Sequence, residues 1–387
     1  MDLLLLAQDV TWGGRAGDAV HLRELARHLS LRGHKVRVVA RPSADGTFDL
    51  PDVEVHPVRS SFDLAFAPIR KPAVIRALFR AVGARRPDVV YSRSFGDLGE
   101  ALATAAAGLP LVYEVNGDAL AEREVQLGRP LPAPVRAWAM RAARLAFRRA
   151  RSVVVVTEVL RNRLAANFDV PRESIQVVPN AADTKVFTPR PVAEARSMLN
   201  IPLDRAVVGF VGNLAPWQGV EVLVRAFARL QSRNAFLLIV GGGQAQGVLE
   251  ATVKELAVGD RVRFVGTVPH AQVPAYVAAC DVCTAPMTRE RLKSGSSAIK
   301  IYEYLACERP VVASRIPGLE FLESDDLGRL VPPEDVEALS AALRAALEDE
   351  VWRQAAGRRG RAYVLRHAGW PTVAAAVEDV CRRAVSA

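Results

Sequence analysis

Short apolar runs alternate with amphipathic segments along most of the chain. In the N-terminal half, the runs that read as strands are LLLLA (3–7), VRVVA (36–40), VEVHP (53–57), DVVYS (88–92), LVYEV (111–115) and SVVVV (152–156). The segments between them, such as residues 17–31, carry apolar positions at helical spacing. Strands that are covered on both faces of a parallel sheet read as nearly continuous apolar runs. The N-terminal half is therefore predicted to be a parallel sheet between two layers of helices.

A second series with the same alternation begins at Val207. Its strand-like runs are VVGFVG (207–212), FLLIVGG (236–242), VRFVG (262–266), DVCTAP (281–286) and PVVAS (310–314). Two such series predict an α/β fold with two Rossmann-like, doubly wound domains.

The stretch between the two series, residues 179–202, is rich in Pro, Asn and Asp and marks the predicted domain boundary. We place the first domain at residues 1–185 and the second at residues 200–366. Helices predicted over residues 335–347 and 351–366 end the second domain. The last predicted helix, residues 370–387, could pack back on the first domain.

Length and composition agree with two globular domains. A chain of 387 residues is longer than one hydrophobic core usually supports. Half of the residues are hydrophobic and 24% are charged, as in soluble α/β proteins. No apolar run is long enough to span a bilayer, and the opening MDLLLLAQD reads as a buried strand, not as a signal peptide. We therefore expect a cytoplasmic protein.

The cysteines fit a reducing compartment. Cys280 and Cys283 form a CxxC pair, but no second pair or histidine cluster accompanies it. Both lie at an apolar helix-to-strand junction, where cysteine is more often a small core residue than a metal ligand or redox group. We expect no metal or redox site here.

The formal net charge of +9 comes mostly from arginine. The predicted helix over residues 135–151 has one apolar stripe, formed by Val135, Trp138, Ala142 and Leu145. It has a second, basic stripe, formed by Arg141, Arg144, Arg148 and Arg151. Such a helix could make a peripheral contact with an anionic membrane; the favoured alternative is that the apolar stripe packs on its own sheet. No nucleic-acid signature is present, so no nucleic-acid partner is expected.

The segment SGSSAIKIYEYLACERPVVAS, residues 294–314, reads as a small-residue loop, a short helix and a buried strand. Ser296 or Ser297 can cap the helix, and Ser296, Lys300 and Glu303 share one face at helical spacing. A helix N-terminus attracts anions, and Glu303 could accept hydrogen bonds from a nucleoside. The arrangement predicts a nucleotide-diphosphate site; the alternative is an ordinary capped helix with a solvated Glu303.

Glycine-rich turns follow strands in both halves. Gly13 and Gly14 follow the first strand, where a missing side chain lets the backbone approach a phosphate; the alternative is a tight strand-to-helix turn without a ligand. In the second half, Gly212 and Gly219 enclose the turn NLAPWQ, and three glycines follow the next strand at 241–243. The dinucleotide fingerprint GxGxxG is absent, which argues against a nicotinamide or flavin enzyme. Because ligands bind outside the carboxyl ends of parallel strands, we expect these turns to border a cleft.

Several segments, in a specific order and at specific spacing, resemble one enzyme family. They are GGRAGDAVHLRELARHLSLRGHKVRVVA, YEVNGD, VVPNAAD, FVGNLAPWQGVEVLVRAFARL, LLIVGGG, RFVGTVPHAQVPAYVAACDV and KIYEYLACERPVVAS. Through them the chain resembles, nearly end to end, the retaining GT-B glycosyltransferases of family 4. The resemblance implies two Rossmann-like domains that face each other across a cleft, with the nucleotide-sugar donor bound mainly by the C-terminal domain and the acceptor mainly by the N-terminal one.

The resemblance also assigns residues to the donor. Glu303 matches the family glutamate that binds the ribose hydroxyls, and Gly13 matches the glycine whose backbone meets the diphosphate. The donor-binding residues that we predict are Gly13, Gly14, Asn213, Gln218, Gly219, Gly295, Ser296, Ser297, Ile299 and Glu303.

Three of these positions depart from the family pattern. The family's usual Arg and Lys correspond here to Asn213 and Gln218, and the first Glu of its E-x7-E pair corresponds to Gly295. A diphosphate leaving group needs cations or aimed dipoles, and one such donor is typically worth about 3 kcal/mol in the transition state. We predict that Lys300 and the helix start at Ser296 and Ser297 supply them. The loop residues Arg289, Arg291 and Lys293 either help or are merely solvated.

On the acceptor side, polar residues end a buried strand of the first domain. Relatives often carry His or Asn near Asn116, in contact with the transferred sugar, so Asn116 is our first catalytic candidate and Asp118 the second, with Lys300 on the donor side. Arg93 and Glu114 are predicted to bind the acceptor; Glu114 could instead serve as a structural hydrogen-bond acceptor, and Arg93 could instead act in domain closure. Asn180 and Asp183 match the family's inter-domain turn, where a hinge role is expected.

The predicted chemistry uses no metal and no cofactor. The sequence has no DxD metal motif, no carboxylate pair that can be placed around a sugar ring, and no activated Ser or Cys nucleophile. The resemblance implies front-face displacement with retention, in which the departing β-phosphate oxygen takes the proton of the acceptor hydroxyl.

The predicted function is transfer of a sugar from a nucleotide-diphosphate sugar, with a UDP-sugar as first choice, to a hydroxyl of a glycan, a lipid-linked or a small-molecule acceptor. One alternative is a nucleotide-sugar 2-epimerase of the same fold, which would need acid and base carboxylates in the cleft. A second is a relative that binds nucleotide without turnover. A periplasmic-type sugar binder is disfavoured, because no export signal is evident.

Overall fold

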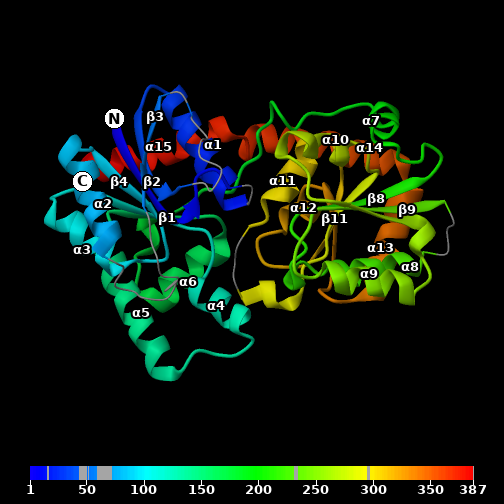
Figure 1. Ribbon diagram of the computed structural model, residues 1–387, viewed down its shortest axis with the longest axis horizontal. Helices are drawn as coiled ribbons and strands as arrows, with labels where there is room; N and C mark the ends of the chain where they lie inside the picture. Colours follow the sequence, from blue (N-terminus) through cyan, green and yellow to red (C-terminus); the bar gives the residue numbers. More distant parts are fainter. Residues whose placement is uncertain are drawn as a thin grey trace. The chain divides into compact units, whose positions relative to one another are not determined.

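The computed structural model describes residues 1–14, 17–42, 50, 52–58, 72–230, 234–293 and 297–386. The chain divides into two compact units. Unit 1 comprises Met1–Asn180, Ser294–Ser297 and Trp370–Ala387, and unit 2 comprises Ala181–Lys293 and Ala298–Gly369. Each unit is a parallel sheet with helices on both faces (Figure 1), which confirms the predicted α/β class.

The sheet of unit 1 has the strand order β3-β2-β1-β4-β5-β6-β7, with every pair parallel. Its strands are β1 (Asp2–Thr11), β2 (Lys35–Arg41), β3 (Val53–Pro57), β4 (Val89–Arg93), β5 (Leu111–Val115), β6 (Ser152–Val155) and β7 (Ile175–Val177). Its helices are α1 (Gly17–Leu31), α2 (Pro72–Ala84), α3 (Leu98–Ala106), α4 (Ala119–Leu127), α5 (Ala133–Phe147), α6 (Glu158–Phe168), the 3-10 turn η1 (Arg172–Ser174) and the C-terminal α15 (Trp370–Ser386). The order of the strands reverses between β1 and β4.

The sheet of unit 2 has the order β10-β9-β8-β11-β12-β13, also parallel. Its strands are β8 (Ala206–Val211), β9 (Ala235–Val240), β10 (Val262–Gly266), β11 (Val282–Ala285), β12 (Val311–Ser314) and β13 (Gly328–Val331). Its helices are α7 (Val192–Leu199), α8 (Val220–Ala228), α9 (Gln246–Glu255), α10 (Val273–Ala278), α11 (Ile299–Ala306), α12 (Phe321–Ser324), α13 (Val336–Glu348) and α14 (Glu350–His367). Its 3-10 turns are η2 (Pro216–Gln218), η3 (Gly259–Arg261), η4 (His270–Gln272) and η5 (Arg289–Lys293). The order reverses between β8 and β11.

Every predicted strand coincides with a strand of the structure, while β7 and β13 were not predicted. The helix α15 contacts α1 and the strands β4, β5 and β6 of unit 1. Its Trp370 and Val377 are buried there. The buried Glu378 binds Arg32 at 2.5 Å and Arg382 at 2.6 Å. These hydrogen bonds lower the pKa of Glu378 to about 2, so the ion pair with Arg32, the residue that follows α1, adds to the apolar contacts of α15.

The helix α5 corrects one prediction. Val135, Trp138 and Leu145, three of the four residues of the predicted packing stripe, are 40%, 48% and 36% exposed. The buried face is formed instead by Ala139, Ala142, Ala143, Ala146 and Phe147. Small residues allow the helix to approach its neighbours closely: a Cβ at Gly96 would lie 3.2 Å from the Cα of Ala143. Val135, Trp138 and Leu145 are therefore left at the surface, while Phe147 is buried with the alanines.

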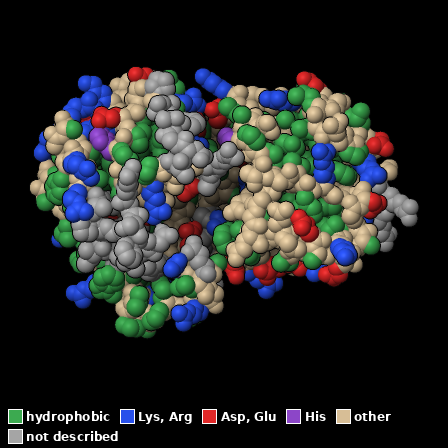
Figure 2. Space-filling model, viewed as in Figure 1, with side chains coloured by type: hydrophobic (Ala, Val, Ile, Leu, Met, Phe, Trp, Pro, Cys, Tyr) green, Lys and Arg blue, Asp and Glu red, His purple; other side chains and the backbone are tan. Residues whose placement is uncertain are grey.

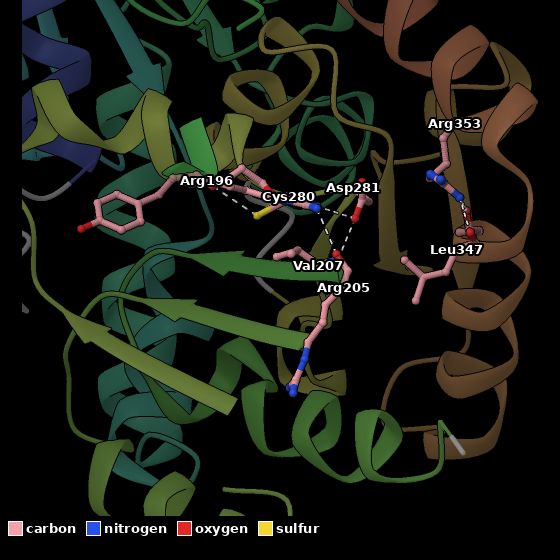
Figure 3. A network of polar contacts seen from close by, with 10 residues as sticks. Arg196, Arg205, Val207, Cys280, Asp281, Leu347 and Arg353 are labelled. Carbon is pink, nitrogen blue, oxygen red and sulfur yellow. Dashed lines mark hydrogen bonds and ion pairs between the residues drawn. The ribbon is translucent and has the colours of Figure 1, made fainter. Parts of the chain in front are cut away.

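A buried arginine joins several segments of unit 2 near the beginnings of β8 and β11 (Figure 3). Arg196 of α7 donates from Nε to Ala279 O at 2.9 Å, from Nη1 to Arg205 O at 3.0 Å and from Nη2 to Asp281 Oδ2 at 2.7 Å. The same carboxylate oxygen accepts from Val207 N at 2.6 Å. Because Arg196 is only 5% exposed, its charge depends on Asp281 for compensation.

Candidate active site

The loops of unit 2 gather at the carboxyl end of β8, next to the point where the strand order reverses. Ligands of doubly wound sheets bind at this place. The chain turns there through Gly212 and Asn213 and through η2, before α8 begins at Val220. The glycine loop after β9 packs on this turn, because Gly212 N donates to Val240 O at 2.9 Å and Leu214 N donates to Gly242 O at 3.0 Å. These backbone contacts hold the turn in one shape.

Lys300, in the first turn of α11, lies against this turn. Its Nζ donates to Gln218 Oε1 at 3.0 Å and lies 4.1 Å from the centroid of the Phe210 ring. Gln218 is one of the two positions at which the family usually carries a basic residue. The structure thus places a cation beside that position, from a different element of the same unit.

The close approach of Lys300 requires a glycine at position 212. A Cβ at Gly212 would lie 2.6 Å from Nζ and 3.0 Å from Cε of Lys300, and the φ of Gly212 is +150°. A side chain at this position would push the ammonium group away, and the backbone angle is one that residues other than glycine rarely adopt. Gly212 therefore belongs to the site through the room that it leaves for the ammonium group.

Burial, and after it the charge of Arg291, lower the pKa of Lys300 to about 7, although the charge of Glu303 acts in the opposite direction. An anion beside the ammonium group would favour its protonated form. The site is therefore suited to a negatively charged ligand.

Among the basic loop residues, Arg291 lies near enough to act on the pKa of Lys300. Arg289 is exposed, and its Nε lies 3.3 Å from Glu334 Oε2. The side chain of Lys293 lies outside the described part of the chain.

Glu303 follows Lys300 on the same face of α11. Its side chain is 14% exposed, and Oε1 lies 3.4 Å from His270 Nε2 of η4. The ring of His270 meets that of Phe187 edge to face, with centroids 5.4 Å apart. The sequence analysis missed His270, because residues 33 apart in the chain give no local signal of contact.

The start of α11 differs from the prediction. The helix begins at Ile299, its N-cap is Ala298, and no side chain caps it. Ser297 lies one residue too early to cap the first turn, and its carbonyl accepts from Asn180 Nδ2 at 3.1 Å. Ser296 and Gly295 lie outside the described residues. The predicted serine cap is therefore wrong for Ser297, and no side chain of the described residues caps the first turn of α11.

In unit 1, the glycine turn after β1 is fixed by an arginine of α1. Gly14 N donates to Thr11 O at 2.8 Å, and Arg23 Nη1 donates to Trp12 O at 2.8 Å and to Gly14 O at 2.7 Å. A Cβ at Gly14 would lie 2.9 Å from Thr11 O, so the turn is too tight for a side chain. Gly13 lies in this turn, and its contact with a diphosphate stays a prediction.

Glu114, the residue before the last one of β5, is a buried carboxylate, 3% exposed. Its Oε1 lies 2.5 Å from Asn116 Nδ2, 2.8 Å from His21 Nε2 and 3.5 Å from Arg93 Nε. Arg93 also donates from Nη1 to Asp18 O at 2.7 Å. The structure thus brings together three of the predicted acceptor-side residues. It also adds His21, which the sequence analysis missed.

Asp118 caps α4, since its Oδ1 accepts from Leu120 N and Ala121 N, both at 3.1 Å. This contact gives Asp118 a structural role, and a catalytic role for it stays a prediction. At the start of unit 2, Asp183 Oδ1 accepts from Lys185 N at 2.9 Å, as in a side-chain-stabilised turn.

The comparisons with known proteins agree with this picture. Residues 205–349 match the family described as glycosyl transferases group 1, and residues 16–186 match glycosyltransferase family 4. A D-inositol 3-phosphate glycosyltransferase of Acidothermus cellulolyticus is 30% identical over 370 residues, which cover 87% of this chain and 79% of the relative. The chain belongs to the group 1 glycosyltransferases. The predicted family and enzyme class are therefore confirmed.

Two solved structures resemble this glycosyltransferase over nearly its whole length. Sucrose-phosphate synthase from Thermosynechococcus elongatus has a TM-score of 0.83 at 22% identity, covering 100% of this chain and 99% of the other. HepE from Anabaena, solved in complex with UDP, has a TM-score of 0.78 at 22% identity, covering 99% and 100%. These likenesses confirm the GT-B fold of the glycosyltransferase.

Within the described ranges, no three His, Cys, Asp or Glu side chains are grouped so that they could hold a metal ion. Cys280 and Cys283 are buried free thiols, as are Cys307 and Cys381. Among the helices formed by the described residues, none is both long and apolar enough to cross a bilayer.

Proposed function

We propose that this glycosyltransferase transfers a sugar, with retention of configuration, from a UDP-sugar to an acceptor hydroxyl. The observation that carries the proposal is the contact of Lys300 with Gln218 over Gly212, at the carboxyl end of β8. The proposed role of Lys300 is to neutralise the diphosphate, in place of the basic pair that Asn213 and Gln218 replace. The neutral amides of these two residues can still donate hydrogen bonds to phosphate oxygens.

The nucleoside end of the donor is assigned to Glu303. Its half-buried carboxylate can accept hydrogen bonds from the two ribose hydroxyls, while His270 holds it from one side. The choice of uridine is supported by HepE, which was solved with UDP.

In the proposed mechanism, the bond between the anomeric carbon and the β-phosphate oxygen breaks as the acceptor hydroxyl attacks the same face. The departing phosphate oxygen takes the hydroxyl proton, so no protein base is required. Lys300 and the free N–H groups at the start of α11 stabilise the charge that develops on the leaving UDP. Since these groups supply positive potential, we propose that transfer needs no metal ion.

Nucleotide binding tests this assignment. We expect Glu303→Ala to weaken UDP binding about 10- to 150-fold, because a hydrogen bond to a charged group is worth about 1.5–3 kcal/mol. Isothermal titration calorimetry in the presence of EDTA measures the affinity and also tests the independence from metal.

The matched control is Glu348→Ala, which removes an exposed carboxylate at the end of α13 in the same unit. It should bind UDP as the wild type does. Equal affinities for wild type and Glu303→Ala would remove Glu303 from the donor site, and binding that disappears in EDTA would refute metal independence.

We also propose that α5 places unit 1 on an anionic membrane. Trp138, Val135 and Leu145 are exposed on this helix, and Arg141 and Arg148 are exposed beside them. Figure 2 shows hydrophobic atoms next to Lys and Arg atoms where α5 begins. Exposed apolar side chains flanked by arginine suit the boundary between anionic head groups and acyl chains. The acceptor would then be lipid-linked.

Vesicle co-sedimentation tests this contact. We expect Trp138→Ser to weaken binding to phosphatidylglycerol vesicles about fivefold, since burying half of a large apolar side chain contributes about 1 kcal/mol. Leu365→Ser, which changes a 51% exposed residue of α14, is the control and should bind like the wild type. Equal binding of the wild type to phosphatidylcholine and phosphatidylglycerol vesicles would contradict the proposal.

A further inference from the structure

The carboxylate of Glu114 is too deeply buried to be a simple surface ligand for an acceptor. Burial alone would raise its pKa, but the charge and hydrogen bond of His21, together with Arg93 and Asn116, lower the pKa to about 2. Glu114 therefore stays ionised throughout the neutral pH range. A buried charge is tolerated only where its partners are well placed, so its position and theirs depend on one another.

The partners of Glu114 come from three separate elements. His21 belongs to α1, Arg93 ends β4, and Asn116 follows β5. All three nitrogen atoms approach the same oxygen, Oε1. The carboxylate thus joins the ends of two neighbouring strands to the helix that follows the glycine turn.

The side chain of His21 packs against Trp370 of α15. Its ring meets the ring of Trp370 edge to face, with centroids 5.1 Å apart, and Trp370 is 1% exposed at the start of α15. The imidazole can therefore not turn away from Glu114 without disturbing the packing of α15. The packing of His21 on Trp370 thus helps to keep the Glu114 carboxylate in one position at the carboxyl end of the sheet.

We infer that Glu114 is a positioning residue, whose carboxylate fixes the side chain of Asn116 in the orientation that sugar transfer requires. The inference rests on the proposed function, in which Asn116 contacts the transferred sugar. Asn116 Nδ2 donates a hydrogen bond to Glu114 Oε1 at 2.5 Å, and this bond fixes the orientation of the Asn116 side-chain amide. Loss of the charge would release this amide and leave Arg93 without its carboxylate partner.

A double-mutant cycle between Glu114→Gln and Asn116→Ala tests the inference. We expect Glu114→Gln to lower kcat about tenfold to 10²-fold, because small misplacements of a reacting group have effects of this size. In the Asn116→Ala background the same change should lower kcat less than about twofold, since the residue through which it acts is gone. A change in KM without a change in kcat, or equal losses in both backgrounds, would overturn the inference.

A second readout does not need turnover. The side-chain amide signals of Asn116 in ¹H–¹⁵N spectra, assigned with Asn116→Ala, should move on Glu114→Gln, whereas Glu173→Gln, which changes an exposed carboxylate of η1 in the same unit, should leave them in place. Unmoved signals would overturn the inference even if the enzyme is active. If Glu114→Gln does not fold, His21→Asn serves instead and should move the same signals. A wild-type enzyme without transferase activity would refute the proposed function, while the spectra would still decide whether Glu114 orients Asn116.

Discussion

Replacing Lys300 by methionine is expected to lower kcat about 10²- to 10³-fold, the usual cost of removing one group that stabilises developing negative charge. Methionine keeps most of the length of the side chain but removes the ammonium group, which bonds to Gln218 and lies over the Phe210 ring. In this enzyme the loss should be especially large, because Asn213 and Gln218 carry no charge that could compensate. Steady-state kinetics with a UDP-sugar and an active acceptor measure the effect.

The matched control is Lys254→Met on α9, which removes an exposed lysine from the same unit. It should leave kcat unchanged. If both variants had the kcat of the wild type, the proposed role of Lys300 would be wrong. Another group would then have to neutralise the diphosphate.

The acidity of Lys300 adds a pH signature to the same prediction. Its pKa is lowered to about 7, so the free enzyme loses the ammonium charge as the pH rises through 7. The value of kcat/KM should therefore fall above about pH 7. The value of kcat should begin to fall only at a higher pH, because the bound diphosphate is an anion and favours the protonated lysine. In Lys300→Met this limb should be absent. A wild-type profile that is flat between pH 6 and 9 would contradict the assignment.

Most of the two sheets could be predicted from the sequence, because central parallel strands such as LLLLA and LVYEV are covered on both faces and must be apolar throughout. The two missed strands show the limit of this signal. β7 has three residues, IQV, and β13 has four, GRLV, and each is the last strand at one end of its sheet. A strand that is short and paired on one side only needs fewer apolar residues, so its pattern merges with that of a loop.

The helix α5 was predicted in the right place but with the wrong face buried. The prediction of the buried face gave most weight to the large apolar side chains of Trp138 and Leu145. In the fold, the alanine face is buried instead, because small residues allow the helix backbone to approach its neighbours closely. Local periodicity contains no information about how near the neighbouring elements come.

In the candidate site, too, some contacts could be predicted from the sequence and others could not. Residues within one motif, such as Lys300 and Glu303 on α11, could be placed together from helical spacing. The contact of Lys300 with Gln218 could be anticipated only through the family pattern, since the two lie on separate elements. The interaction of His21 with Glu114 had no signal at all, because a histidine in an amphipathic helix looks the same whether it faces solvent or a buried carboxylate.

The largest effect on stability is expected at Asp281. Changing it to alanine should lower the free energy of unfolding of unit 2 by about 3–5 kcal/mol, because Arg196 would be left as a buried charge without its carboxylate. The backbone N–H of Val207 would also lose its acceptor. Chemical denaturation followed by tryptophan fluorescence measures the shift in midpoint, and Asp204→Ala, an exposed carboxylate three residues before Val207, is the control.

The double variant Arg196→Met with Asp281→Ala separates the two causes of this loss. Removing both charges eliminates the uncompensated guanidinium, so the double variant should be more stable than Asp281→Ala alone. A midpoint for Asp281→Ala that equals that of the wild type would mean that Arg196 finds another partner or enough water. In that case the network at the start of β8 and β11 would not be what holds α7 in place.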